Sequence, residues 1–291
     1  MMTTIGLPNA GRQAYYNVLW KTFFEELGFK IIISGETTKE IVDKGVKNSE
    51  MDFCFAIKIY VGHVLELKNK VDYIFVPSMA GLKPYYCPYH VALPDLIKNM
   101  FKDIKLLTGR IQDDGTGIEE VAKKFNKSDK EIKEALEKAR IEWKEERLNE
   151  MRREEEKLKL KKPKIAIIGA DDYISKDKFC LMNIPELLEK NGFVPVFLDH
   201  LKYKEDFKPG FRLQWIIEQE IINKLMDFFY SKQLDGAIYI VPFSCGPCFL
   251  IQEQVLSKFQ DKKILVLHID ESQNETRIKT RIEAFLDVVK K

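Results

Sequence analysis

The chain alternates short apolar runs with segments of helical periodicity, and this alternation constrains its fold more than any other feature. In the first third, patterns typical of helices separate four apolar runs, at residues 3–6, 29–33, 73–76 and 105–107. The alternation restarts after Pro163, where four further strands are expected, at residues 165–169, 194–198, 237–241 and 264–268. Strands that alternate with helices predict parallel β-α-β units. We therefore expect an α/β protein with two parallel sheets.

A highly charged stretch separates these two patterns. It is dense in Glu, Lys and Arg, and it contains neither Gly nor Pro between Ile118 and Lys162. An intermittent apolar stripe that includes Trp143 favours one long helix or a pair of helices. We interpret the stretch as an inserted arm or spacer, and the alternative is a solvated helix with no binding role. The predicted organisation is a first domain at residues 1–116, a helical arm at residues 117–162 and a second domain at residues 163–291. The two domains show no convincing sequence repeat.

The bulk composition argues against several classes of protein. The 291 residues include 47 Lys and Arg against 45 Asp and Glu, and the formal net charge of +2 gives no general attraction to nucleic acid or membranes. The sequence contains no run of about 18 apolar residues, so no membrane-spanning helix is predicted. The amino terminus lacks a secretory signal pattern. We therefore expect a cytoplasmic protein. In a reducing cytoplasm, five cysteines raise the question of metal binding or redox chemistry rather than structural disulfides.

Four of the cysteines lie in segments suited to chemistry. Cys54 comes just before a helical pattern, in DFCFAIKIY, and Cys87 lies in the Pro- and Tyr-rich segment KPYYCPYH. Cys245 and Cys248 form SCGPC directly after the apolar strand AIYIVPF. Because ligands of parallel α/β sheets gather at the carboxyl ends of strands, we expect these segments to converge at one crevice. For Cys180, in DKFCLMNIP, we favour the role of a small buried hydrophobe.

Spacing alone leaves the chemistry of these cysteines open. A Cys-X-X-Cys pair is compatible with half of a zinc site, a redox dithiol or an iron–sulfur ligand pair. No GxxxxGKS/T, GxGxxG or HExxH motif supports a nucleotide-hydrolysing enzyme or a zinc protease. His63 and His90 each follow one of the cysteines, and a hydrogen-bonded structural role is favoured for both. Asp171 and Asp172 follow an expected strand, and we interpret them as a solvated turn.

Several phrases of the sequence together resemble one known family. Nearly the whole chain follows that family's order, through IGLPNAGRQAYYNVLW, CFAIKIYVGHVLEL, VDYIFVP, CPY at Cys87, KPKIAIIGADDYISKDKFCLMNIPELLEKNGF, PFSCGPCFLIQE and HIDESQNETRIKTRIEAFLDVV. These phrases are similar to the activase-related branch of the 2-hydroxyacyl-CoA dehydratase family. The resemblance implies two Rossmann-like domains with a helical insertion. It also implies an oxygen-sensitive [4Fe-4S] cluster between the domains, held by Cys54, Cys87 and Cys245.

The resemblance further implies a function. Enzymatic relatives accept one low-potential electron from an ATP-dependent activase, and they use it in radical dehydration or reduction of a CoA thioester. We see no activase domain in this chain, so a separate activase or other low-potential reductase is the expected partner, while neither nucleic acid nor a membrane is expected and a homodimer stays possible. We therefore predict an iron–sulfur electron carrier, or an activase-dependent reductase or dehydratase component. The alternative is a non-enzymatic module in which Cys54, Cys87, Cys245 and Cys248 hold structural zinc.

Two departures from the family pattern bear on these expectations. Where members often read CGPD, this chain has Cys248 in place of the acid, which would supply a fourth thiolate. We expect Cys248 to lie close to the cluster as a fourth or switchable ligand, and the alternative is that it packs at the start of the next helix. Where a GxPYN-like phrase is usual, the chain reads GADDY, which puts contacts of that loop with substrate phosphate or CoA in doubt. Another branch of the family carries a double-cubane cluster, which would need three thiolates for each cubane. The five cysteines of this chain are too few for that, so we favour a single [4Fe-4S] cluster.

Overall fold

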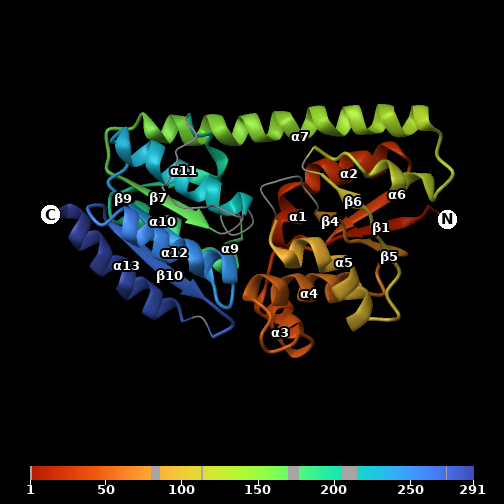
Figure 1. The fold of residues 1–291 in the computed structure, drawn as a ribbon, viewed down its shortest axis with the longest axis horizontal. Coiled ribbons are helices and arrows are strands. Elements are labelled where there is room, and N and C mark those ends of the chain that lie inside the picture. The colour runs from red at the N-terminus through yellow and green to blue at the C-terminus, as the bar shows by residue number, and fades with distance from the viewer. Residues whose placement is uncertain (1, 80–85, 113, 170–176, 205–214, 273) are drawn as a thin grey trace. The chain divides into compact units, whose positions relative to one another are not determined.

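A computed structural model describes residues 2–79, 86–112, 114–169, 177–204, 215–272 and 274–291. For residues 216–218 it describes the backbone alone. The chain divides into two compact units, Met1–Arg147 and Leu148–Lys291, which are called unit 1 and unit 2. Each unit has its own parallel sheet flanked by helices, so the expected α/β fold with two domains is confirmed (Figure 1). Asp171 and Asp172, for which we expected a turn, lie outside the described residues.

Four parallel strands form the main sheet of unit 1, in the order β2-β1-β3-β5. These strands are β1 (Thr4–Leu7), β2 (Lys30–Ile33), β3 (Tyr73–Phe75) and β5 (Leu106–Leu107). All four were predicted from apolar runs in the sequence. A further pair of parallel strands, β4 (Ser78–Met79) and β6 (Arg110–Ile111), was not expected, because two residues are too few to show a periodic pattern.

The helices of unit 1 cover both faces of this sheet. They are α1 (Gly11–Tyr15), α2 (Asn17–Glu26), α3 (Lys39–Lys47), α4 (Phe55–Leu67), α5 (Pro88–Met100) and α6 (Glu119–Lys123). Helix α2 buries Trp20 and Phe24 on one face, and their rings lie 5.5 and 5.2 Å from the ring of Phe75 in β3. Figure 1 shows α2 on one side of the sheet and α3 with α4 on the other, as right-handed crossovers from a central β1 require.

Unit 2 repeats this architecture. Its parallel strands are ordered β10-β9-β7-β8, and they are β7 (Lys164–Gly169), β8 (Val194–Phe197), β9 (Gly236–Pro242) and β10 (Ile264–Ile269). Strand β9 is buried along its whole length, which is the pattern of a strand with neighbours on both edges and covered faces. Its described helical elements are α9 (Lys178–Leu181), α10 (Ile184–Lys190), η1 (Leu198–His200), α11 (Ile216–Tyr230), α12 (Gly246–Lys258) and α13 (Glu275–Lys290).

The two main sheets share one topology. When the strands of each sheet are numbered along the chain, both sheets have the order 2-1-3-4. The order reverses between β1 and β3 in unit 1, and between β7 and β9 in unit 2. Ligand sites of parallel α/β proteins form outside the carboxyl ends of the strands at such a switch point. The loops after β3 and β9 therefore lie where a ligand site is expected in each unit.

The charged stretch at residues 117–162 contains α6 and the long helix α7 (Asp129–Leu158), and the division between the units falls inside α7. In unit 1, the indole nitrogen Nε1 of Trp143 donates to the carbonyl oxygen of Tyr15 at 3.3 Å. In unit 2, the backbone N–H of Phe197 donates to Oε2 of the buried Glu154 at 2.8 Å. Each half of α7 is thus tied to the unit that contains it. Among the described helices, none combines the length and apolar character needed to cross a membrane.

Candidate functional site

Three of the five cysteines occupy the N-cap position of a helix. Cys54 precedes α4, Cys87 precedes α5 and Cys245 precedes α12, and each of these helices has 13 residues. The first turn of a helix presents unpaired backbone N–H groups and a partial positive charge, which favour a thiolate over a thiol. Cys180 differs, because it lies inside α9 and is fully buried, and burial raises its pKa well above the usual thiol value. The three N-cap cysteines are those that the family resemblance assigns to a cluster.

In unit 1, Cys54 and Cys87 come together around Tyr89. Burial is the main cause of the raised pKa of Tyr89, and negative charge on Cys54, Asp52 and Cys87 raises it further. The ring of Tyr89 also lies 5.7 Å from that of Phe53, the residue before Cys54. The phenol of Tyr89 therefore lies close to both cysteines.

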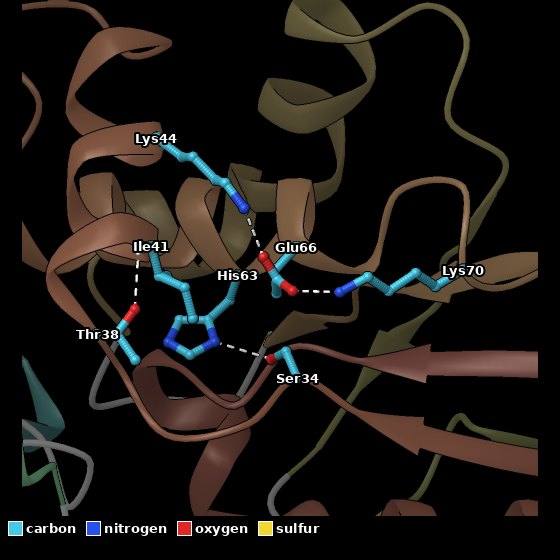
Figure 2. A network of polar contacts seen from close by, with 7 residues as sticks. All are labelled: Ser34, Thr38, Ile41, Lys44, His63, Glu66 and Lys70. Carbon is cyan, nitrogen blue, oxygen red and sulfur yellow. Dashed lines mark hydrogen bonds and ion pairs between the residues drawn. The ribbon is translucent and has the colours of Figure 1, made fainter.

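His63 fixes the helix that carries Cys54. Its Nδ1 lies 2.8 Å from the hydroxyl of Ser34, which follows β2, and its Nε2 lies 2.9 Å from the hydroxyl of Thr37. Figure 2 shows the contact with Ser34, together with Thr38 capping α3. Because both ring nitrogens are hydrogen-bonded inside the protein, His63 has the structural role that we favoured. It holds α4 against the loop that connects β2 to α3.

Two glycines bring α3 and α4 into backbone contact. A Cβ atom at Gly45 would lie 1.9 Å from the carbonyl oxygen of Lys58, and one at Gly62 would lie 2.1 Å from that of Ile41. Any side chain at these two positions would force the helices apart. On the exposed side of the same pair, Glu66 lies between Lys44 and Lys70 (Figure 2), and its hydrogen bonds to both ammonium groups lower its pKa to about 2.

A small cavity lies at the carboxyl ends of β1 and β3. Its water-accessible volume is about 20 Å³, enough for one water molecule, and its lining includes Arg12, Gln13, Tyr60 and His90. The Tyr60 hydroxyl donates to Gln13 Oε1, and Gln13 Nε2 donates to the carbonyl oxygen of Phe75 at 2.9 Å. The lining residues come from the segment after β1 and from the first turns of α4 and α5. The starts of those helices, and with them Cys54 and Cys87, therefore lie at the carboxyl edge of the sheet.

The imidazole of His90 also lines this cavity. Burial, and secondarily the positive charge of Arg12, lowers its pKa to about 4, so the ring is neutral at pH 7. Sequence reasoning identified His90 but missed Arg12, Gln13 and Tyr60. The usable signal was the polar segment NAGRQ directly after the first strand, at the switch point of the sheet.

In unit 2, Cys245 and Cys248 are in contact. Their Sγ atoms are 2.7 Å apart, and the pair spans the first turn of α12, just after β9. Cys245 is half-buried, whereas Cys248 is 1% exposed. The hydrogen bond from the Cys248 thiol is the main cause of a lowered pKa at Cys245, and burial opposes it. Cys248 therefore packs at the start of α12, beside Cys245, and its role as a fourth or switchable cluster ligand stays a prediction.

The donor set fits a thiolate-bound metal centre in its chemistry. Each unit presents two thiols at the carboxyl edge of its sheet, and thiolates are the ligands of iron–sulfur clusters and of structural zinc. Within the described parts of either unit, no cluster of three or more His, Cys, Asp or Glu side chains is placed to hold a metal ion.

Fold and site together define a class: α/β proteins with two parallel-sheet units that carry cysteines at helix N-termini. Residues 4–201 match the family described as CoA enzyme activase uncharacterised domain (DUF2229). The match covers more than half of the chain, and the protein belongs to this family. It includes Cys54 and Cys87 and ends before Cys245. A search of curated proteins finds no match. The activase-related part of the resemblance is thus confirmed, and its dehydratase and iron–sulfur parts stay predictions.

Proposed function

We propose that this protein is an iron–sulfur redox protein in which Cys54, Cys87 and Cys245 hold one [4Fe-4S] cluster. The observation that carries this proposal is the shared N-cap placement of these three cysteines, in contrast to Cys180, which lies inside α9. Membership of an activase-related family supports it, because an activase works with a partner that accepts an electron. The proposed role is that of a low-potential electron carrier, or of an activase-dependent reductase or dehydratase component related to 2-hydroxyacyl-CoA dehydratases.

The chain's own residues have distinct tasks in this proposal. The helix N-termini stabilise the negative charge of the three thiolates. The phenol of Tyr89 lies beside Cys54 and Cys87, and His63 positions α4 and its N-cap. A bound cluster supplies one-electron transfer at low potential. The electron comes from a separate ATP-dependent activase or another low-potential reductase.

Metal and sulfide analysis tests the proposal. The full chain is purified without oxygen, and iron, acid-labile sulfide, zinc and visible absorption are measured. We expect a brown protein with near-equal iron and sulfide, and a large loss of both in Cys54→Ala, Cys87→Ala and Cys245→Ala. Cys180→Ala is the matched control, since it removes a buried thiol of unit 2 and should keep the full iron content. Full iron in Cys87→Ala would contradict the ligand assignment, and a colourless protein that holds zinc would establish the structural-zinc alternative.

The position of Cys248 decides between electron carrier and catalyst. A [4Fe-4S] cluster held by three cysteines keeps one iron open to water or substrate, whereas a fourth thiolate closes that iron. Because Cys248 lies beside Cys245, we propose that it is a fourth or switchable ligand. Cys248→Ser should then retain the cluster but change the electron paramagnetic resonance signal of the reduced protein when small ligands are added. The same spectra in Cys248→Ser and in the unmodified protein would show that Cys248 is a spectator.

A further inference from the structure

The Cys245–Cys248 pair has features that a metal-ligand role does not require. Ligands of a common metal need contact only the metal, but these two sulfur atoms contact each other, 2.7 Å apart. Gly246 and Pro247 separate them in the sequence. Pro247 lies in the first turn of α12, a position where proline favours the start of a helix. The two thiols are thus held within reach of one another by the local turn.

The two thiols also differ in access. Cys245 is half-buried and follows Phe243 and Ser244, which are both exposed, so a reagent can reach it from solvent. Cys248 is buried in the first turn of α12, and its carbonyl oxygen accepts a hydrogen bond from the hydroxyl of Tyr239 at 3.2 Å. An accessible first sulfur and a buried second sulfur are the arrangement that thiol–disulfide exchange uses, because the second thiol then attacks only what the first has bound.

We propose that Cys245 and Cys248 form a thiol–disulfide exchange site, whose co-substrate is a disulfide of low molecular weight or of a partner protein. The Cys245 thiolate attacks one sulfur of the co-substrate, RSSR, forms a mixed disulfide and releases RS⁻. The Cys248 thiolate then attacks Cys245 Sγ, closes the Cys245–Cys248 disulfide and releases the second RS⁻. Two cysteine thiols are oxidised and one co-substrate disulfide is reduced to two thiols. Two protons pass from the cysteines to the released thiolates.

The exchange site has a consequence for metal binding, and this consequence alone rests on the proposed function. A disulfide at Cys245 removes the only unit 2 thiolate among the three proposed cluster ligands. Closing the pair therefore blocks assembly of the cluster, and reducing it makes assembly possible again. The pair would thus decide when the protein can accept iron.

A redox titration of the metal-free full chain tests the exchange site. The protein is treated with a chelator, equilibrated in mixtures of reduced and oxidised glutathione, quenched with acid and alkylated. Both cysteines lie on a single tryptic peptide, because no Lys or Arg occurs between Gln233 and Lys258. At the most oxidising glutathione ratios, we expect this peptide to lose both alkylation sites together and to carry a disulfide. Cys248→Ser should stop at a mixed disulfide with glutathione at Cys245, Cys245→Ser should give neither product, and Cys180→Ser should behave like the unmodified protein.

Two outcomes would overturn the inference. In one, both cysteines of this peptide stay open to alkylation at the most oxidising ratio. In the other, Cys245 pairs with a cysteine outside the peptide. Iron reconstitution of portions of the same samples, taken before the acid quench and alkylation, separates this result from the proposed function. A disulfide in a chain that never binds iron refutes the cluster and leaves the exchange site standing. A chain that binds iron and forms no disulfide refutes the exchange site and leaves the cluster standing.

Discussion

Units 1 and 2 have the same strand order but place their thiols by different means. In unit 1, Cys54 and Cys87 belong to two helices, and their proximity depends on how α4 and α5 pack. In unit 2, Cys245 and Cys248 lie within one helical turn, and their proximity is local. Two sheets of the same topology therefore present thiol pairs of different kinds. The proximity of one pair depends on the packing of the whole domain, and that of the other depends on a single helical turn. Disturbing the core should affect the first pair much more than the second.

The strongest test of this difference is Gly62→Ala. The added Cβ would lie 2.1 Å from the carbonyl oxygen of Ile41, so α3 and α4 must separate. We expect a loss of about 3 kcal/mol in the free energy of unfolding of unit 1, at the upper end for overpacked sites. Urea unfolding followed by Trp fluorescence measures it. Gly35→Ala is the control, because a Cβ there meets nothing within 4 Å. The Cys245–Cys248 disulfide should still form in Gly62→Ala, and its loss would show that unit 2 depends on unit 1 for its pair.

A second test uses pH to address unit 1. His90 has a pKa of about 4 in the folded protein, below its ordinary value of 6.5. Between these values the unfolded chain binds a proton that the folded chain does not, so stability falls as the pH drops from 6.5 toward 4. The total loss is at most about 3 kcal/mol, and the partly exposed ring reduces it. Urea midpoints of the metal-free protein at pH 7 and 4.5 should differ more than those of His90→Gln. Equal pH dependence in the two proteins would refute this role.

Ser34→Ala should have a smaller effect on the same helix. The hydroxyl of Ser34 accepts from the backbone N–H of Asn9 at 2.7 Å and bonds His63 at 2.8 Å. Removing it takes one hydrogen bond from the buried His63 and one from the partly buried backbone of Asn9, at about 2 kcal/mol in total. Thermal unfolding measures the change, and Ser272→Ala, at an exposed position of unit 2, is the control. If the two variants unfold at the same temperature, the His63 contacts do not hold α4.

The smallest effect is expected at Glu66. This carboxylate bonds Lys44 and Lys70, and those bonds lower its pKa to about 2 (Figure 2). Both lysine side chains are at least half exposed, so solvent screens the ion pairs, and Glu66→Gln should cost less than about 1 kcal/mol. The difference should shrink further in 1 M salt. A larger change, unaffected by salt, would mean that the side chain packs rather than pairs.

Local patterns predicted much of the fold, and distant contacts were not predicted. Every long strand was visible as an apolar run, and β9 showed its burial in the sequence AIYIVP. The N-cap position of Cys54 was close to prediction, since a helical pattern was expected just after it, whereas Cys87 was expected only in a Pro- and Tyr-rich segment. The contact of Gly45 and Gly62 with the opposite helix could not be predicted, because it depends on how two helices approach. The same holds for the association of Gln13 with Tyr60 and for the division of the chain inside α7.

The order of the two sheets along the chain has a consequence for biosynthesis. All strands of the unit 1 sheets precede residue 112, and all strands of the unit 2 sheet follow residue 163. Domains generally fold as units while the ribosome is still translating, the amino-terminal one first. Cys54 and Cys87 can therefore reach their final places before Cys245 has been synthesised. During that interval the nascent chain holds two of its five thiols in a folded unit, and it depends on the reducing power of its surroundings to keep them reduced.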